Sequence, residues 1–241
     1  MTHTLEATRT VGELAVAVPG AARIFESMGI DFCCGGHRTL GAACASQGIE
    51  VNEILAALEF GQTLPEKTDE HWQSEPLPAL IGHIVARHHQ YVRSEVPHIQ
   101  RWLDKTVAAH GERHPELLRI RHHFAAMATE LSQHMAKEEL ILFPAIARLA
   151  GHAAPGATCF DSLAQPVRMM LLEHEHAGRD LAEMRQASGE FTPPPDACTT
   201  YRTLYRALAE FDADLRQHVH LENNILFPRA LALEKDSAHA D

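Results

Sequence analysis

The feature that most constrains the fold of this chain is an internal repeat. The segment HMAKEELILFPAIARL begins at His134 and HVHLENNILFPRALAL begins at His218, so equivalent positions lie 84 residues apart. RHHQYVR around His89 and LEHEHAGR around His174 form a weaker repeat, offset by 85 residues. A duplicated helical hairpin explains both offsets. Two such hairpins, packed antiparallel, would bring two equivalent sets of side chains together about a pseudo-twofold axis, which suits two metal ions.

Apolar residues recur at helical spacing over four long stretches, which predicts an up-down four-helix bundle. These stretches run over 77–109, 115–150, 162–187 and 199–233, and short clusters of Gly and Pro separate them. Strand patterns are absent from the sequence, and shorter helical runs between residues 10 and 60 predict a small helical domain. We therefore expect an all-α chain with a helical domain over 1–62, a linker over 63–76 and a four-helix bundle over 77–235.

Within the repeat, a histidine stands four residues before a glutamate, at His134 and Glu138 and again at His218 and Glu222. Residues at i and i+4 lie about 6 Å apart on one helix face, so each pair can offer a nitrogen and a carboxylate to one point. Both pairs fall within the apolar stripe, which predicts that they are buried. A buried carboxylate without a partner is costly, so two at matching depth indicate bound cations.

The other two helices each supply one inward histidine. In the third helix the apolar face selects His174, whereas His176 lies among polar residues. In the first helix, periodicity fits His89 and fits His88 nearly as well, so it leaves the choice between them open. A lone histidine on an apolar face is more often a core residue than a ligand, but the duplication favours a metal site.

Four histidines and two glutamates would give each of two ions two imidazoles, with the carboxylates bridging. Helix bundles hold di-iron and di-manganese sites in this way. Zinc sites more often contain cysteine or three closely spaced ligands, so the set favours iron, with manganese and mixed pairs as alternatives. The remaining clusters, His110 with His114 and His122 with His123, we interpret as surface or loop residues.

Two adjacent cysteines, Cys33 and Cys34, lie in the turn-like segment DFCCGG. The glycines that follow would expose the thiols and let backbone amides approach an anion, conditions that favour a reactive thiolate. The alternative is a pair of small buried residues at a tight turn. We treat Cys33 and Cys34 as candidate functional thiols.

The charge and hydropathy of the chain argue against several classes of function. Lys and Arg number 21 and Asp and Glu 32, a formal net charge of −11 that would repel a phosphate backbone. The sequence contains neither a signal peptide nor a run of about 18 apolar residues that could span a membrane. Five irregularly spaced cysteines suit a reducing compartment. We expect a cytoplasmic protein that binds neither nucleic acid nor membrane.

The DFCCGG segment, the motifs SQHMAKEELILFP and RQHVHLENNILFPRAL, and the loop TPPPDACTTY together resemble the repair-of-iron-centres proteins over nearly the whole chain. These bacterial proteins join a short cysteine-containing domain to a hemerythrin-like bundle. The resemblance implies two non-haem iron ions, bridged by carboxylates and an oxo or hydroxo group. It selects His89 over His88. The implied ligands are His89, His134, Glu138, His174, His218 and Glu222, and the implied paired cysteines are Cys33 and Cys34.

The resemblance also implies a role in stress response. Family members help to restore iron-sulfur clusters damaged by nitric oxide or peroxide, and some bind nitric oxide. Oxygen-carrying hemerythrins have five histidines, a glutamate and an aspartate, so the set found here argues against oxygen transport.

Our main hypothesis is a repair protein that supplies iron to damaged iron-sulfur proteins, with Cys33 and Cys34 as a docking or transfer point. One alternative is a nitric oxide buffer or sensor that uses the same di-iron centre. Another is an enzyme that turns over nitric oxide or peroxide, and a repair protein that binds metal fits better than a turnover enzyme. A homodimer is compatible with the sequence.

Overall fold

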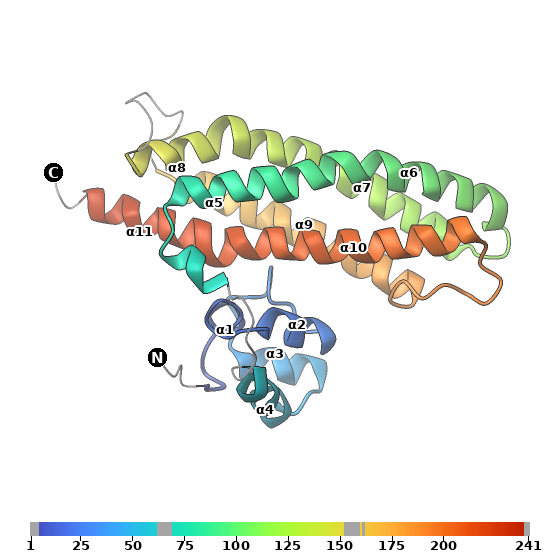
Figure 1. The fold of residues 1–241 in the computed structure, drawn as a ribbon, viewed down its shortest axis with the longest axis horizontal. Helices are drawn as coiled ribbons and strands as arrows, with labels where there is room; N and C mark the ends of the chain where they lie inside the picture. Colours follow the sequence, from blue (N-terminus) through green and yellow to red (C-terminus); the bar gives the residue numbers. More distant parts are fainter. Residues whose placement is uncertain (1–4, 62–68, 152–159, 161, 239–241) are drawn as a thin grey trace.

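The computed structural model describes residues 5–61, 69–151, 160 and 162–238. The regular elements in these residues are helices. The β-type pairing found among them is limited to an isolated bridge between Thr10 and Thr39. A long helical bundle carries a small helical domain against one side (Figure 1). The predicted all-α fold is confirmed. Within the described ranges, no helix combines the length and the apolarity needed to cross a bilayer.

The small domain is formed by four short helices. Thr10 begins the first of them through a capping box, in which its side chain accepts from the N–H of Glu13 and the Glu13 carboxylate accepts from the N–H of Thr10. Leu14, Phe25 and Leu40 are fully buried at its centre. The helices are α1 (Val11–Ala17), α2 (Ala21–Ser27), α3 (Leu40–Gln47) and α4 (Val51–Gly61).

The bundle has four long helical rods, three of them interrupted by a π-helical segment. The first comprises α5 (Leu77–His83), η2 (Ile84–His89) and α6 (Gln90–His110). The second comprises α7 (Glu116–Lys137), η3 (Glu138–Leu142) and α8 (Phe143–Leu149). The third is α9 (Ala164–Ser188), and the fourth comprises α10 (Thr199–Leu221), η4 (Glu222–Leu226) and α11 (Phe227–Ala238).

The predicted linker is partly ordered into structure. Residues 63–68 lie outside the described residues, but Asp69–Gln73 form a 3-10 helix, η1. The Arg229 guanidinium on α11 donates hydrogen bonds to the backbone carbonyls of Trp72 and Glu75. The segment that leads into the bundle is therefore held against its last helix.

Each π-helical segment begins or ends at a predicted metal ligand. The N–H of Phe143 bonds to the carbonyl of Glu138, and that of Phe227 to the carbonyl of Glu222, five residues earlier in each case. A proline follows each phenylalanine and lacks the N–H that a regular helical turn uses. A π turn inserts an extra residue and is frequent at functional sites. The insertions therefore shift the helical register at the level of the predicted ligands.

Two apolar clusters flank that level, and both include residues of the small domain. The first includes Phe124 and Phe211 and continues into the core of the small domain. The second surrounds Phe143 and Phe227, towards the other end of the bundle. An ion pair between Arg216 and Glu26 adds a polar contact between the two units. The small domain thus packs on the bundle as part of a shared core.

Candidate metal centre

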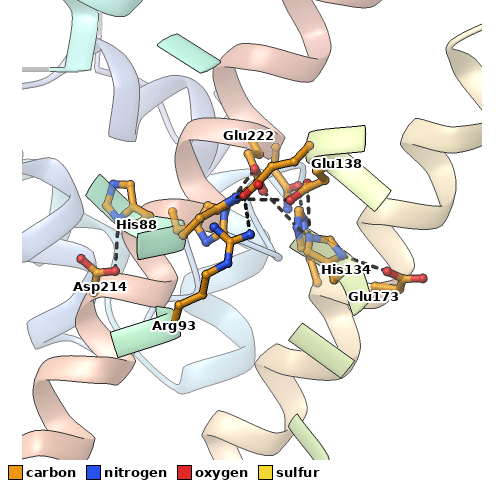
Figure 2. Close-up of polar contacts among 12 residues, drawn as sticks. His88, Arg93, His134, Glu138, Glu173, Asp214 and Glu222 are labelled. Atoms are coloured by element: carbon orange, nitrogen blue, oxygen red, sulfur yellow. Dashed lines mark hydrogen bonds and ion pairs between the residues drawn. The ribbon is translucent and has the colours of Figure 1, made fainter. Parts of the chain in front are cut away.

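The six predicted ligands meet in the bundle core between the two apolar clusters. Each of them is at most 3% exposed. Their potential ligating atoms form two groups of four, and within each group all atoms lie within 4.8 Å of one another. Figure 2 shows Glu138 and Glu222 approaching each other from opposite helices. The first group, which we call the 134/174 tetrad, is His134, Glu138, His174 and Glu222; the second, the 89/218 tetrad, is His89, Glu138, His218 and Glu222.

In the 134/174 tetrad, four donor atoms converge. The Nε2 atoms of His134 and His174 lie 3.0 Å apart. Oε1 of Glu138 lies 3.2 Å from Nε2 of His134, and Oε2 of Glu222 lies 3.1 Å from Nε2 of His174. One oxygen from each glutamate therefore belongs to this tetrad.

The 89/218 tetrad uses the other oxygen of each glutamate. The Nε2 atoms of His89 and His218 lie 3.1 Å apart. Oε2 of Glu138 lies 3.4 Å from Nε2 of His89, and Oε1 of Glu222 lies 3.1 Å from Nε2 of His218. Because each carboxylate directs one oxygen to each tetrad, both are positioned to bridge two cations.

Hydrogen bonds on the outer side orient three of the four imidazoles. Nδ1 of His134 lies 2.8 Å from a carboxylate oxygen of Glu173, which Figure 2 shows beside it. Nδ1 of His174 lies 2.7 Å from Oδ1 of Asn223. Since each oxygen accepts the proton on Nδ1, the lone pair on Nε2 points into the tetrad, as metal ligation requires.

In the 89/218 tetrad only one histidine has such an acceptor. Nδ1 of His89 lies 2.6 Å from Oε1 of Glu139, which also accepts from Arg93. Nδ1 of His218 is buried and forms no hydrogen bond among the described residues. Its ring instead stacks on His88, with 5.6 Å between the ring centroids and 8° between the planes. Packing rather than a hydrogen bond therefore orients His218.

The structure separates His88 from His89, which periodicity could not do. His89 lies in the tetrad, whereas Nδ1 of His88 lies 3.1 Å from Oδ2 of Asp214, away from the glutamates (Figure 2). Arg87 also contacts Asp214, at 3.1 Å. His88 thus belongs to a neighbouring ion-pair cluster.

The buried charges of the two tetrads suit a bound cation. Both oxygens of Glu138 and Oε2 of Glu222 are buried and have no hydrogen-bond partner of good geometry among the described residues. Burial alone would raise the pKa of Glu222, but His218 and His174 lower it well below its usual range. Burial opposes the charged form of His134, yet Glu138 outweighs it and raises the pKa of His134 to about 9. Converging lone pairs and two buried carboxylates therefore fit metal cations, which would replace these protons.

The cysteine loop lies directly against the 134/174 tetrad. The Sγ of Cys34 donates to the backbone carbonyl of His174 at 3.3 Å. Nδ2 of Asn223 donates to the carbonyl of Cys33 at 3.1 Å, so the same amide holds both the cysteine loop and the imidazole of His174. Oδ1 of Asp31 accepts from the N–H groups of both cysteines. The loop and the centre are thus connected by the Asn223 side chain and by the direct contact of Cys34 with His174.

The expectation that both thiols are exposed is wrong for Cys33. Its side chain is buried, at 5% exposure, whereas Cys34 is partly exposed. Hydrogen bonding with Cys34, burial and the Asp31 carboxylate raise the pKa of Cys33 well above its usual range. Cys33 belongs to the apolar cluster shared by the small domain and the bundle, and this packing covers the thiol that the following glycines were expected to expose. The interpretation of His110 as a surface or loop residue is also wrong, because it is 8% exposed and is the last residue of α6.

Sequence reasoning missed the outer partners Glu139, Glu173 and Asn223. A signal for two of them was present, because Glu139 and Asn223 occupy equivalent places in the repeat, directly after Glu138 and Glu222. Each accepts the Nδ1 proton of a histidine on a different helix. A polar residue that follows each bridging glutamate could therefore have been predicted to orient a ligand.

Comparison with known protein families gives two matches, one to the N-terminal part of the chain and one to the bundle. Residues 7–61 match a domain of unknown function, DUF542. Residues 80–230 match the hemerythrin HHE cation-binding domain. The second match contains all six residues of the two tetrads.

Relatives match over most of the chain. The iron-sulfur cluster repair protein YtfE of Yersinia pseudotuberculosis serotype IB (strain PB1/+) is 39% identical over 223 residues, which cover 92% of this chain and 96% of the relative. The protein of the same name from Yersinia pestis (strain Pestoides F) matches with the same identity and the same coverage. The chain therefore belongs to the family of the iron-sulfur cluster repair proteins, in which a DUF542 domain precedes a hemerythrin HHE cation-binding bundle.

Proposed function

We propose that this chain holds two iron ions, one in each tetrad, and supplies iron for the repair of iron-sulfur clusters damaged by nitrosative or oxidative stress. His134 and His174 would hold one ion and His89 and His218 the other, with Glu138 and Glu222 bridging. The proposal is supported by the two oxygens of each glutamate, which face different tetrads. The names of the relatives support the repair role.

The donor set favours iron over other cations. Each ion would receive two imidazole nitrogens and two carboxylate oxygens, a mixture that suits iron and manganese, and no cysteine among the described residues belongs to either tetrad. Four protein donors per ion also leave positions for a bridging oxygen or an added ligand. The bound iron would supply the metal that a damaged cluster has lost.

The contact between the cysteine loop and the ligand His174 carries the proposal that iron is the cargo. Cys34 lies on the backbone of a ligand, and it also lines a cavity of about 720 Å³ between the small domain and the bundle. Cys33, Gly178 and Arg216 line the same cavity. A thiol that contacts the backbone of a ligand and lines a cavity would be close enough to receive iron released from His174.

Hydrogen bonding and protonation of the ligand histidines would control the release of iron. The Nδ1 proton of His174 is accepted by Oδ1 of Asn223. This side-chain oxygen is oriented by the hydrogen bond that Nδ2 of the same side chain donates to the backbone carbonyl of Cys33. Displacement of the cysteine loop would therefore weaken the hydrogen bond that orients His174. Protonation of Nε2 of His134 would then partly compensate the two glutamates, because Glu138 raises the pKa of this imidazole once the metal is absent.

Elemental analysis of protein purified anaerobically, beside a His134→Ala, Glu138→Ala variant, tests the metal site first. We expect two irons per chain, falling sharply in the variant. The same metal content in both proteins, or no iron in either, would contradict the site.

Iron transfer to an acceptor whose cluster has been damaged by nitric oxide tests the function. A donor loses iron in proportion to the activity that the acceptor regains. A chain that binds nitric oxide, keeps both irons and leaves the acceptor inactive would favour a buffer or sensor instead. Recovery at the wild-type rate with a Cys33→Ser, Cys34→Ser variant would remove the thiols from the transfer step.

A further inference from the structure

A second cluster of metal-ligating residues lies at the opposite end of the bundle from the α8 and α11 ends. His110 is the last residue of α6, and His114 lies in the turn before α7. Asp196 and Cys198 lie between α9 and α10, and Cys198 precedes the first residue of α10. The two connections meet at one end of the bundle (Figure 1). Along α6 this end is roughly 30 Å from His89, so the cluster is separate from both tetrads.

His114 is oriented as a metal ligand would be. Its Nδ1 lies 3.0 Å from Oε1 of Glu116, and its Nε2 lies 3.1 and 3.2 Å from the two carboxylate oxygens of Asp196. When Glu116 accepts the Nδ1 proton, the lone pair on Nε2 faces the carboxylate of Asp196. Two acceptors then face each other, and either a proton on Nε2 or a cation must lie between them.

His110 is buried beside this pair and lacks a full set of partners. Its Nε2 lies 3.2 Å from the Sγ of Cys198, and its Nδ1 is buried with no hydrogen bond to any described residue. A buried polar atom without a partner destabilises the folded protein. An imidazole in contact with a thiol and close to a second imidazole and a carboxylate is a typical set of metal donors.

We propose that His110, His114, Asp196 and Cys198 form a third metal site, which binds zinc. Potential ligating atoms of His110, His114 and Asp196 already lie within 4.8 Å of one another. Tetrahedral zinc with bonds of about 2.0–2.3 Å separates its ligand atoms by about 3.3–3.7 Å, so binding requires small shifts of these side chains, including a slight separation of His114 Nε2 from the Asp196 oxygens, which now lie at 3.1 and 3.2 Å. The thiol of Cys198 is exposed and adjoins His110, and rotation of its side chain would complete the set.

The donor set distinguishes this site from the tetrads. Two imidazoles, one carboxylate and one thiolate favour zinc, whereas the tetrads contain no thiol among the described residues. Zinc here would link the turn after α6 to the segment before α10. The site would therefore be structural, closing the end of the bundle that is remote from the iron ligands.

Zinc titration of the iron-loaded protein, with a competing chelator present, tests the proposal. We expect one zinc ion per chain beyond the iron, at least a hundredfold weaker binding in His114→Ala and in Asp196→Asn, and unchanged iron content in both. The control His122→Ala removes an exposed histidine of α7 and should bind zinc as wild type does. Equal zinc binding by wild type, His114→Ala and Asp196→Asn would overturn the site.

Cobalt(II) in place of zinc tests the thiolate. A tetrahedral cobalt site with one thiolate gives a sulfur-to-cobalt charge-transfer band, which Cys198→Ser should abolish. A band that persists in Cys198→Ser but disappears in Cys33→Ser, Cys34→Ser would assign the metal to the cysteine loop and overturn the proposal.

A Glu138→Gln, Glu222→Gln variant separates this proposal from the iron centre. It should lose iron and still bind one zinc ion, with circular dichroism confirming that the helices remain. Loss of zinc together with iron in a folded variant would show that the added zinc occupies the tetrads, which would contradict the third site.

Discussion

The two tetrads have equivalent ligands but different surroundings. Each contains two histidines from different helices and one oxygen from each of Glu138 and Glu222. In the 134/174 tetrad both histidines have an acceptor for the Nδ1 proton, Glu173 and Asn223. In the 89/218 tetrad only His89 has one, Glu139, while His218 stacks on His88.

The repeat explains where this difference arises. Glu139 and Asn223 occupy equivalent positions, and each accepts the Nδ1 proton of a ligand histidine, although one side chain is charged and the other is neutral. Glu173 and His88 are also equivalent, each preceding a ligand histidine, but the first accepts a proton from His134 and the second bonds to Asp214 instead. Duplication therefore preserved the ligands while their outer partners diverged.

The largest effect is expected where the tetrads are identical. Glu138→Ala removes one oxygen from each tetrad, so we expect the loss of both ions. Metal binding should weaken more than about a hundredfold, which exceeds the effect of removing a residue that only hydrogen-bonds to a ligand. Glu138→Gln should also lower the thermal stability of the metal-free protein near neutral pH, because it leaves the protonated His134 without its buried partner. Metal analysis and thermal unfolding measure the two effects.

The control is Glu130→Ala, which changes an exposed glutamate of α7 and should keep both ions. If Glu138→Ala lost only one ion, the bridging assignment would be wrong and the two tetrads would be independent sites.

A second prediction concerns the difference between the tetrads. Because His218 has no Nδ1 acceptor, the ion of the 89/218 tetrad should leave first under a chelator, about tenfold faster than the other. Loss of metal should therefore occur in two phases, followed by absorbance of the chelator complex.

Outer-partner variants assign the phases. Glu139→Ala should accelerate only the fast phase, and Glu173→Ala only the slow phase, so that in the second variant the two phases approach each other. A single phase in the wild type, or the opposite assignment, would mean that the outer hydrogen bonds do not decide the order.

A third prediction separates docking of the small domain from metal binding. Asn223→Ala removes the bonds to Cys33 and to His174, so the thiols should react faster with a maleimide and one ion should bind about tenfold more weakly. Asn224→Ala is a matched variant, since Asn224 bonds to the Phe32 carbonyl and to His220 rather than to a ligand.

Asn224→Ala should therefore increase thiol labelling without changing metal affinity. Similar metal loss in both variants would show that docking of the domain, and not the bond to His174, stabilises the centre.

The smallest effect is expected at Gly178 on α9. A Cβ at this position would lie 3.2 Å from the Sγ of Cys34, so Gly178→Ala should displace the thiol by a few tenths of an ångström and increase its labelling a few-fold. Gly82→Ala on α5, where the added Cβ meets no atom within 4 Å, should stabilise the helix by about 0.5–1 kcal/mol. Gly178→Ala should increase the stability less than Gly82→Ala does. An equal increase in the free energy of unfolding in both variants would show that Cys34 is not in tight contact with α9.

The sequence by itself determined the all-α fold, the four bundle helices and the spacing of His134 with Glu138 and of His218 with Glu222. These features depend on helical periodicity and on an internal repeat. Both are patterns of the linear sequence and need no knowledge of how the helices pack. The family assignment also followed from motifs in the sequence, and the comparisons confirm it.

Only the tertiary structure decided how residues on different helices meet. It paired His88 with Asp214, buried Cys33, placed Asn223 between the cysteine loop and His174, and brought His110 together with Cys198. Periodicity reports which face of a helix is buried, but a hydrogen bond between helices depends on their relative rotation and depth. The π-helical segments change that rotation at the ligands, so the outer partners could not be read from spacing alone.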